Sequence, residues 1–244
     1  MKVYSNLNMN KKIAIVQSNY IPWKGYFDII NMVDEFIVYD DAQYTKRDWR
    51  NRNKIKTNHG LKWLTIPVKV KGRFSQSVNE VVILNKDWVS NHLKTIKHCY
   101  SKAKFFNEYY PFFENIYLNQ AINECYLSSI NLLFIKFICK IFNINTKITL
   151  SSNYSLSKIG QTEKLIELCN YTNANSYLSG PNAKKYLDVN KFSDASIKLE
   201  WFNYDNYIRY NQLYPPFNHH VSIIDLILNE GNNSFEFLKS KRKL

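Results

Sequence analysis

The sequence predicts an α/β fold: a Rossmann-like, mainly parallel sheet with a helical subdomain. Three observations lead to this prediction. Short apolar runs end in polar turns, segments with apolar residues at helical spacing lie between them, and the middle of the chain has a long helical pattern. Parallel strands need a crossover connection, and a helix supplies it, so this alternation favours a parallel sheet.

The first strand, helix and strand are predicted within residues 13–41. IAIVQ, residues 13–17, is a short apolar run of the kind found in buried parallel strands, and it stops at the polar turn SNYIPWKG. YFDIINMV, residues 26–33, has apolar residues at helical spacing, and FIVYDD, residues 36–41, is a second strand that ends in two carboxylates. In such a unit the loop after the first strand lies at the edge of the sheet where ligands bind.

The following 100 residues divide into a basic segment, two predicted strands and a helical region. KWLTIPVKV, residues 62–70, and VNEVVIL, residues 78–84, are expected to be strands. Residues 88–106 are expected to form one helix, and residues 116–142 one or two more. We therefore predict a helical subdomain over residues 87–145, between an N-terminal α/β half at 1–86 and a C-terminal α/β half at 146–244.

The C-terminal half returns to the alternation of strands and helices. The expected order is a strand, an amphipathic helix, a short strand ending at Gly180, a short helix and a last strand, over residues 146–152, 162–174, 176–180, 182–188 and 197–202. This pattern adds three strands to the sheet.

Composition excludes several classes of protein. Hydrophobic residues make up 45% of the chain and charged residues 22%, with six glycines and six prolines, which excludes a disordered or collagen-like chain. The first twelve residues, MKVYSNLNMNKK, have no apolar core of a signal peptide, and no stretch of about 18 uncharged apolar residues follows. We expect a cytoplasmic protein.

The positive charge is concentrated in one segment. The chain has a net charge of +13, and residues 44–73 hold ten Lys and Arg against the single acid Asp48, which gives 10 − 1 = +9. A local field of one sign attracts anionic ligands, such as the phosphates of a nucleotide, RNA or an anionic membrane surface.

The turn after the first predicted strand is the first candidate binding block. Backbone amides at a helix start, together with a lysine, suit a phosphate group. The turn also resembles that of the nucleotidylyltransferases, but it is one residue shorter and lacks both of their histidines, and the chain has no GxGxxG or GxxxxGK[ST] motif. The predicted binding residues of this block are Gln17, Tyr20, Lys24, Gly25 and Tyr26.

The second candidate block runs from Tyr39 to Asn53. Its adjacent carboxylates, Asp40 and Asp41, would hold Mg²⁺ or take a proton from an amine, or would simply cap a turn. Carboxylates, amides, cations and aromatic rings are denser here than a solvated loop requires. The predicted binding residues of this block are Gln43, Tyr44, Lys46, Arg47, Trp49, Arg50, Asn51, Arg52 and Asn53.

His92 is the third candidate, as a general base on the predicted helix at 88–106. It shares a helix face with Trp88, whereas His98 lies six residues further on and is displaced around the axis, so the two histidines make a poor metal pair. A histidine that packs and hydrogen-bonds in the core is the alternative. We predict no metal site.

Together these blocks resemble the WbqC-like protein family of bacterial O-antigen and surface-polysaccharide gene clusters. The resemblance covers nearly the whole chain, and its specific part is the ungapped YDD-Q-Y-K-R-W-NRN string of the second block. One departure is Ser18, where the family commonly has proline. A third similar segment, GQTEKLIELCNYTNANSYLSGPNAKKYLD, adds Gln161, Ser179 and Gly180 to the predicted binding residues.

The resemblance implies a transferase that joins glycine or another small acyl group to the amine of a nucleotide-linked amino-deoxy sugar. The residues fit this reaction: Asp40, Asp41 or His92 would take the amine proton, and the cations would hold a pyrophosphate. The acyl donor stays open among an aminoacyl-tRNA, an acyl carrier thioester and an amino acid activated by ATP with Mg²⁺, and no cofactor is assigned.

Two alternative functions remain open on the sequence. An ATP-dependent, nucleotidylyltransferase-like amide ligase would require ATP and Mg²⁺ for turnover. A non-catalytic RNA-binding or scaffold protein would use the basic, aromatic surface instead, and its affinity for RNA would fall steeply with salt.

Overall fold

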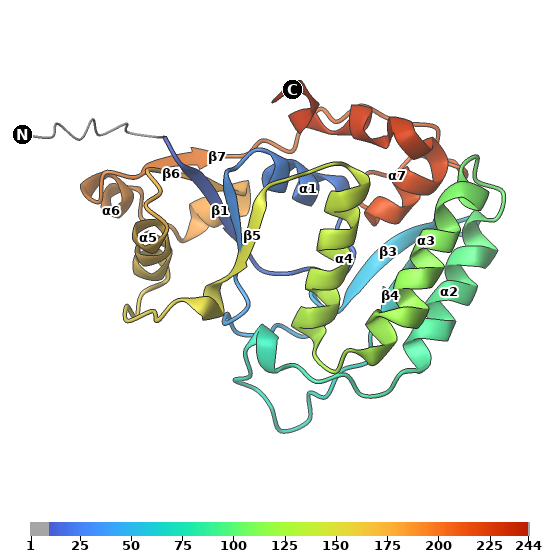
Figure 1. The fold of residues 1–244 in the computed structure, drawn as a ribbon, viewed down its shortest axis with the longest axis horizontal. Helices are drawn as coiled ribbons and strands as arrows, with labels where there is room; N and C mark the ends of the chain where they lie inside the picture. Colours follow the sequence, from blue (N-terminus) through green and yellow to red (C-terminus); the bar gives the residue numbers. More distant parts are fainter. Residues whose placement is uncertain (1–9, 244) are drawn as a thin grey trace, which may run out of the picture. The chain divides into compact units, whose positions relative to one another are not determined.

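A computed structural model describes residues 10–243 and contains a five-stranded sheet in which every neighbouring pair is parallel (Figure 1). The strands lie in the order β5-β2-β1-β6-β7. Counted along the chain within this sheet, that order is 3-2-1-4-5, the order of doubly wound Rossmann folds. The predicted α/β, Rossmann-like fold is confirmed. The strands are Lys12–Val16, Glu35–Val38, Lys147–Leu150, Ser176–Ser179 and Lys198–Trp201 for β1, β2, β5, β6 and β7.

The chain forms two compact units. The first contains the sheet and consists of the described residues up to Val16, residues 33–38 and residues 146–203. The second consists of residues 17–32, 39–145 and 204–244. The polypeptide therefore leaves the sheet after β1 and again after β2, and both of the main candidate blocks belong to the second unit.

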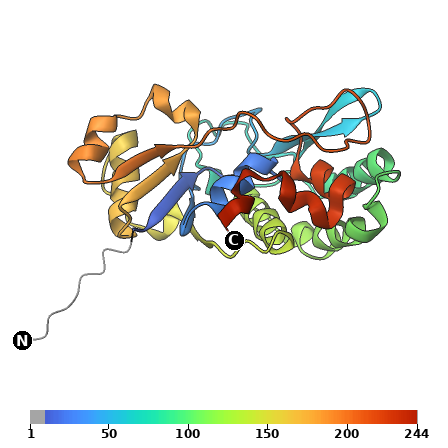
Figure 2. The ribbon, with the colours of Figure 1, turned by 90° about the horizontal axis from the view of Figure 1, so that it is seen from above.

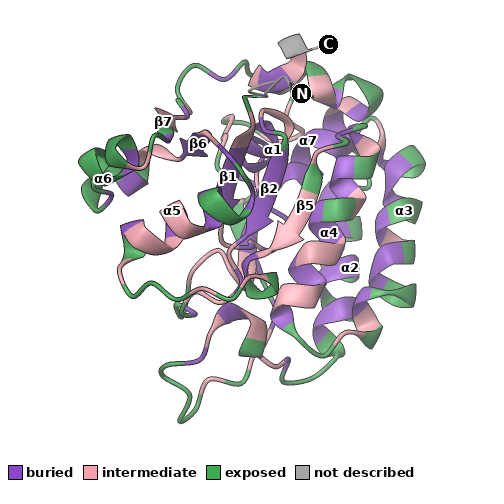
Figure 3. Ribbon diagram, turned by 60° about the vertical axis from the view of Figure 1, so that its left-hand side comes forward, coloured by how far each residue is buried: buried purple, intermediate pink, exposed green. Residues whose placement is uncertain are grey.

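The central strands are apolar because they are covered on both faces. Ile13, Ala14 and Phe36 are fully buried, and Figure 3 shows β2 buried along its length, while β1 is buried at its three middle residues. Helices α5 (Gln161–Tyr171) and α6 (Val189–Asp194) connect β5 to β6 and β6 to β7; the outer face of α5 is mostly half-buried and that of α6 is exposed (Figure 3). This burial explains why the sequence shows continuous apolar runs rather than the alternation of a half-exposed sheet.

The second unit is built from helices and one antiparallel hairpin. Helices α2 and α3 pack side by side (Figure 1), and the segment from residue 204 to Ser222 passes along the hairpin (Figure 2), where the Ser222 amide donates to the Lys54 carbonyl at 2.8 Å. The elements are α1 (Lys24–Asn31), β3 (Arg52–Thr57), β4 (Gly60–Thr65), α2 (Asp87–Tyr100), α3 (Phe106–Asn119), α4 (Leu127–Ile141) and α7 (Ile223–Glu230).

The prediction of a strand over residues 78–84 is wrong. Val78–Glu80 is a short 3₁₀ helix, followed by single bridges at Val82 and Ile83. The cause is local: the Glu80 carboxylate accepts from the amide of Ser77 at 2.8 Å, and the Ser77 side chain accepts from the amide of Glu80, which together form a capping box. Hydrogen bonds within the segment thus replace those of a strand.

Strand β3 was not predicted from the sequence, and several predicted boundaries differ from those of the structure. In β3 the cations Arg52, Lys54 and Lys56 alternate with Asn53, Ile55 and Thr57, so the strand has a single apolar residue and the composition of a basic loop. The strand expected over 62–70 is β4, which ends at Thr65, before Pro67, a residue that has no amide to donate. The helix expected over 88–106 ends at Tyr100, and α3 begins at Phe106 rather than at residue 116.

The division into parts at residues 86 and 145 stays a prediction. One of the two predicted boundaries, at residue 145, coincides with a boundary between the compact units: residue 145 belongs to the second unit and residue 146 to the first. No helix in the described part of the chain combines the length and apolar character needed to cross a membrane.

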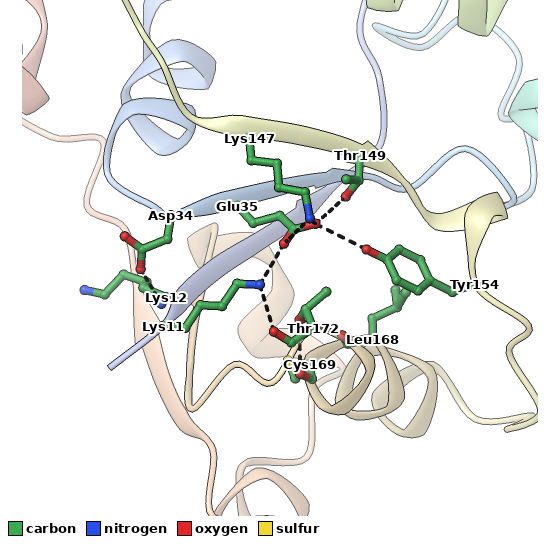
Figure 4. Close-up of polar contacts among 10 residues, drawn as sticks. All are labelled: Lys11, Lys12, Asp34, Glu35, Lys147, Thr149, Tyr154, Leu168, Cys169 and Thr172. Carbon is green, nitrogen blue, oxygen red and sulfur yellow. Dashed lines mark hydrogen bonds and ion pairs between the residues drawn. The ribbon is translucent and has the colours of Figure 1, made fainter. Parts of the chain in front are cut away.

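A buried carboxylate ties together the amino ends of the strands in the first unit (Figure 4). Glu35, which begins β2, accepts from Lys11 Nζ at 2.8 Å and from Lys147 Nζ at 3.2 Å. Thr149 and Tyr154 donate to its other oxygen at 2.9 and 3.2 Å. Burial raises the pKa of the Glu35 carboxyl, but the hydrogen bonds from Lys11, Thr149 and Lys147 outweigh burial and hold the pKa below its usual range. The carboxylate is therefore ionised in the folded protein.

We expect Glu35→Gln to lower the free energy of unfolding at pH 7 by about 1–3 kcal/mol, because a neutral amide leaves two lysines and two hydroxyls without their anionic acceptor. Urea denaturation measures this change. The control is Glu163→Gln, which removes the partner of Lys191 in an exposed ion pair and should change stability little. Equal stability of Glu35→Gln and the wild type would contradict a structural role for this carboxylate.

Candidate functional site

The loop between β1 and α1, residues 17–23, is held in a strained conformation. Ile21 has a φ of 38°, in the left-handed region that β-branched residues rarely adopt. Such a residue costs on the order of 1–3 kcal/mol and persists only where the surroundings fix it. Burial of the Ile21 side chain, which is 1% exposed, offsets part of that cost.

Hydrogen bonds from distant side chains fix the backbone of this loop. The Ile21 carbonyl accepts from Asn53 Nδ2 and from Ser222 Oγ, both at 2.8 Å. Asn53 Nδ2 also donates to the Tyr20 carbonyl at 3.1 Å, and the Tyr20 amide donates to the Trp49 carbonyl at 3.0 Å. The two candidate blocks therefore meet through main-chain and amide contacts, and Asn53 acts as a support for the loop.

Tyr20 continues inward into a chain of buried hydrogen bonds. Its hydroxyl contacts Tyr117 Oη and His92 Nδ1, the latter at 2.9 Å, and His92 Nε2 lies 3.2 Å from the Thr65 carbonyl. Because a carbonyl only accepts, Nε2 carries the proton, Nδ1 accepts from Tyr20, and Tyr20 accepts from Tyr117. Both ring nitrogens of His92 are thus occupied.

Burial lowers the pKa of His92 to about 4, a shift that the hydrogen bond to Thr65 only partly opposes. The histidine is 5% exposed and packs edge-on against Trp88, with ring centroids 5.3 Å apart. His92 is therefore neutral at physiological pH and positions Tyr20. Its role as a general base stays a prediction, and this environment favours the packed, hydrogen-bonded alternative.

Lys24 turns toward the interior of the second unit. Its Nζ donates to the Ile208 carbonyl at 3.1 Å and lies 4.6 Å from the centre of the Tyr207 ring. Burial lowers the pKa of Lys24 to about 8, although the charge of Asp28 opposes this shift. The Asp28 carboxylate accepts in turn from the Tyr207 hydroxyl. This lysine connects α1 to the segment around residue 208, so we leave it out of the proposed site.

The start of α1 is closely packed around Gly25. A Cβ atom on Gly25 would lie 2.5 Å from the Trp23 ring, so glycine lets that ring lie against the first turn of the helix. The Tyr26 hydroxyl donates to the Gln17 carbonyl at 3.2 Å. Gly25 and the buried Tyr26 therefore shape the loop, while the Gln17 and Asn19 side chains remain half-exposed.

The carboxylates of the second block follow directly after β2. Val16 and Val38, the last residues of β1 and β2, are paired, so Gln17 and the Asp40-Asp41 pair leave the sheet at the same edge. Asp40 is 2% exposed, and its carbonyl accepts from the Asn79 amide at 2.9 Å. Asp41 is half-buried. Of the two, Asp41 is the more accessible to a ligand.

The residues after Asp41 run beside residues 74–78. Gln43 is exposed, and its side-chain amide donates to the Phe74 carbonyl at 3.0 Å, while the buried Tyr44 donates its main-chain amide to the Gln76 carbonyl at 2.9 Å. Asn51 is buried, and its side chain donates to the Ile66 carbonyl at 2.9 Å. The side chains of Gln43 and Asn51 and the main-chain amide of Tyr44 thus hold the segment in place.

Four cations of the second block lie nearer the surface. Lys46 and Arg47 are exposed. Arg50 donates to Asn19 Oδ1 and lies 3.6 Å from Asp48, which places a half-buried guanidinium beside the first loop. Arg52 donates to the Arg47 carbonyl, and Trp49 packs on a second tryptophan of the hairpin. Arg50 is the cation that the structure brings to the strained loop.

Gln161, Ser179 and Gly180 belong to the first unit, at the carboxyl edge of its sheet. Ser179 ends β6, Gly180 follows it, and Gln161 begins α5, the helix that returns the chain from that edge. Between β1 and β6 the parallel pairing stops after the pair of Ile13 and Tyr177. This is the topological switch point, where open α/β sheets bind ligands.

Sequence reasoning missed two residues that support the site, Asn131 and Ser222. Asn131 of α4, which is fully buried, donates to Ser18 Oγ at 3.1 Å and to the Arg50 carbonyl at 2.8 Å. Ser222 caps α7 and also binds the Ile21 carbonyl. The sequence offered one indication of this role: Asn131 is a polar residue among the apolar positions of a predicted helix. Within residues 10–243 no group of three or more His, Cys, Asp or Glu side chains is placed to hold a metal ion.

Comparison with known proteins assigns the chain to a family. The sequence model of the WbqC-like protein family matches residues 17–237, nearly the whole chain. The chain belongs to the WbqC-like protein family. It is 47% identical over 233 residues to "Uncharacterized protein Rv1507c" of Mycobacterium tuberculosis, covering 96% of this chain and all of that protein. No solved structure matches it. Membership of the WbqC-like family suggests a biosynthetic, enzyme-like role.

We expect the stability of this WbqC-like protein to fall as the pH drops from about 6.5 to about 4. The unfolded chain takes up a proton on His92 in that range while the folded chain does not, so the neutral buried histidine destabilises the fold by up to about 3 kcal/mol at the acid end. Urea denaturation at several pH values measures the slope.

The variant His92→Gln should flatten that slope, and His98→Gln, at an exposed position of the same helix, should leave it unchanged. The pKa of His219 is also lowered to about 4, first by burial and then by the charge of Lys24. His219 therefore adds to the pH dependence of wild-type stability with the same sign. The comparison is therefore made between variants. A slope that is the same in His92→Gln and wild type would show that His92 is not a buried neutral group.

Proposed function

We propose that this WbqC-like protein is a transferase of surface-polysaccharide biosynthesis. It joins an aminoacyl group, such as glycyl, or another small acyl group to the amine of a nucleotide-linked amino-deoxy sugar. The amine attacks the acyl carbonyl, an amide bond forms, the bond to the donor's leaving group breaks, and the amine proton passes to a base. The proposal places the reaction in the cytoplasm, as predicted from the sequence.

The observation that carries the proposal is the strained and heavily supported loop at residues 17–23. A backbone held at an unfavourable φ by Asn53 and Ser222 is rigid before any ligand arrives, and preorganised groups stabilise a transition state without the cost of reordering. Strained residues cluster at ligand sites for this reason. The half-exposed Gln17 and Asn19 on this loop supply neutral hydrogen-bonding groups for a sugar.

The positive charge near the strained loop supports an acceptor substrate that is anionic. The guanidinium of Arg50 lies at this loop through its contact with Asn19, and Lys46 and Arg47 add exposed positive charge in the same block. Arginine binds phosphate oxygens through two parallel hydrogen bonds, and a pyrophosphate offers several such oxygens. These cations favour the nucleotide diphosphate part of the acceptor.

Among the three proposed catalytic residues, Asp41 is the best placed to accept the amine proton. His92 is enclosed, with both nitrogens bonded, and Asp40 is 2% exposed, whereas Asp41 is half-buried at the edge where β2 ends. A half-buried carboxylate can reach a ligand and still be oriented by the protein. We assign the base to Asp41 and leave Asp40 as its neighbour in the same turn.

Three classes of acyl donor are compatible with the proposed acceptor. An aminoacyl-tRNA or an acyl carrier thioester would bring an activated carbonyl, whereas a ligase would activate the amino acid with ATP and Mg²⁺. A coupled assay with glycine, ATP and Mg²⁺ against preformed glycyl-tRNA or thioester separates these possibilities, because a transferase turns over without ATP.

We expect Asp41→Asn to lower the turnover of acyl transfer at least 100-fold while leaving the melting temperature nearly unchanged, because an amide cannot take the amine proton. Turnover is measured as amide formation on a nucleotide-linked amino sugar. The control is Asp194→Asn, the same change at an exposed carboxylate of α6. Full activity of Asp41→Asn would remove this residue from the mechanism.

We expect Arg50→Lys to weaken binding of a thymidine- or uridine-diphosphate amino sugar roughly tenfold, because lysine keeps the charge but loses the paired hydrogen bonds. Calorimetric titration measures this affinity, and Arg73→Lys, at an exposed position of the same basic segment, is the matched control. Equal weakening by both variants would indicate a diffuse field rather than a specific contact with Arg50.

A further inference from the structure

The outer face of the β3–β4 hairpin carries aromatic and cationic side chains, of which Trp63 is exposed and Arg52 and Lys54 are half-buried. Along β3, Asn53 and Ile55 are buried, while Arg52 and Lys54 point to the other face. Lys54 is paired with Trp63 of β4, and directly opposite residues of an antiparallel pair share a face. The same alternation that buries one side of the hairpin therefore gathers cations and a tryptophan on its outer side.

The rings and cations of this face lie against one another. The Trp63 ring centre is 5.2 Å from that of Trp49, and the two planes meet at 45°. The guanidinium carbon of Arg52 lies 4.1 Å from the Trp63 ring centre, and Lys54 Nζ lies 4.8 Å from the same ring and 5.7 Å from that of Trp49. We call these four residues the hairpin platform. Cations over tryptophan rings orient them and keep them at the surface.

The charge of the hairpin platform is not neutralised within the described residues 10–243. Among the described residues, no carboxylate lies within 4.0 Å of the charged groups of Arg52 or Lys54. The buried Nε of Arg52 also has no hydrogen-bond acceptor among these residues. Trp63 is 37% exposed, which is unusual for so large an apolar ring. A face that displays flat rings together with uncompensated cations is complementary to a polyanion that carries flat rings.

We propose that the hairpin platform binds single-stranded nucleic acid, by stacking one or two bases on its tryptophans and placing the adjoining phosphates on Arg52 and Lys54. Stacking on aromatic side chains requires bases that are not enclosed in a duplex, and it tolerates any sequence because each base has a flat face. Nearby, Lys46 lies 4.8 Å from the ring of Phe74, which is 75% exposed, and these two extend the same chemistry.

The partner would be RNA rather than a membrane because the platform combines two tryptophan rings with cations that lie against them. A membrane-binding face gains most from apolar side chains that reach into the acyl chains, whereas here a guanidinium covers the Trp63 ring. Anionic lipid vesicles therefore serve as the competing outcome in the test.

This platform also suits the donor side of the proposed transfer. An aminoacyl-tRNA carries its acyl group on an unpaired 3′ end, which is a single strand of the kind described. This connection rests on the proposed function, but RNA binding by the platform does not, and the experiment below measures binding alone.

The test uses the full chain and a fluorescein-labelled ten-nucleotide oligouridine, with fluorescence anisotropy at several salt concentrations. We expect the oligonucleotide to bind more tightly than a ten-base-pair RNA duplex, with log affinity falling against log salt at a slope of about −2, as some three phosphate contacts would give. Trp63→Ala should weaken binding about tenfold, and Trp63→Phe should restore most of it.

The matched control is Trp201→Ala, since Trp201 of β7 also lies under a cation, with Lys184 Nζ 5.5 Å from its ring centre, but outside the hairpin. This variant should bind RNA like the wild type. Equal affinity of the wild type and a Trp49→Ala, Trp63→Ala double variant would overturn the proposal. So would binding to phosphatidylserine vesicles that the double variant loses while its RNA affinity is unchanged. RNA binding without acyl transfer would leave the platform in place and reject only the proposed function.

Discussion

The carbonyl of Ile21 is the point on which the candidate site depends. Two side chains from widely separated parts of the sequence, Asn53 and Ser222, donate to it, and they hold a β-branched residue in the left-handed region. Two hydrogen bonds of about 1 kcal/mol each and a buried isoleucine side chain are together enough to offset a strain of about 1–3 kcal/mol. Loss of either support would let the loop relax, and Gln17 and Asn19 would lose their fixed positions.

Burial separates the polar candidate residues into two groups. Tyr20, Asn51, Asn53 and His92 are inside and bind the backbone or one another, so they fix the shape of the site. Asp41 and the arginines are nearer the surface and keep the capacity to meet a ligand. Polar density in this region thus has two causes: a rigid scaffold needs polar supports, and an anionic ligand needs cations.

The cations of the basic segment, residues 44–73, likewise fall into groups with different surroundings. Lys56 is buried, with its Nζ donating to the Pro216 carbonyl, while Arg52 and Lys54 lie on the outer face with the tryptophans. Arg50 instead contacts the loop at Asn19. One charged stretch of sequence therefore serves a structural contact, the proposed sugar-nucleotide site and the hairpin platform, because its cations meet different neighbours along its length: Asn19 at Arg50, the tryptophans at Arg52 and Lys54, and Pro216 at Lys56.

The sequence by itself determined the parallel sheet and the location of the polar blocks. Runs such as residues 13–16 and 36–38 are apolar throughout because both faces of a central parallel strand are covered, and that leaves a pattern in the sequence. Only the tertiary structure decided that β3 is a strand, that His92 is enclosed and that Asn131 supports Ser18 across 113 positions of the chain. The physical reason is that a hydrogen-bond partner can lie anywhere in the chain, whereas propensity and periodicity report only on neighbouring residues.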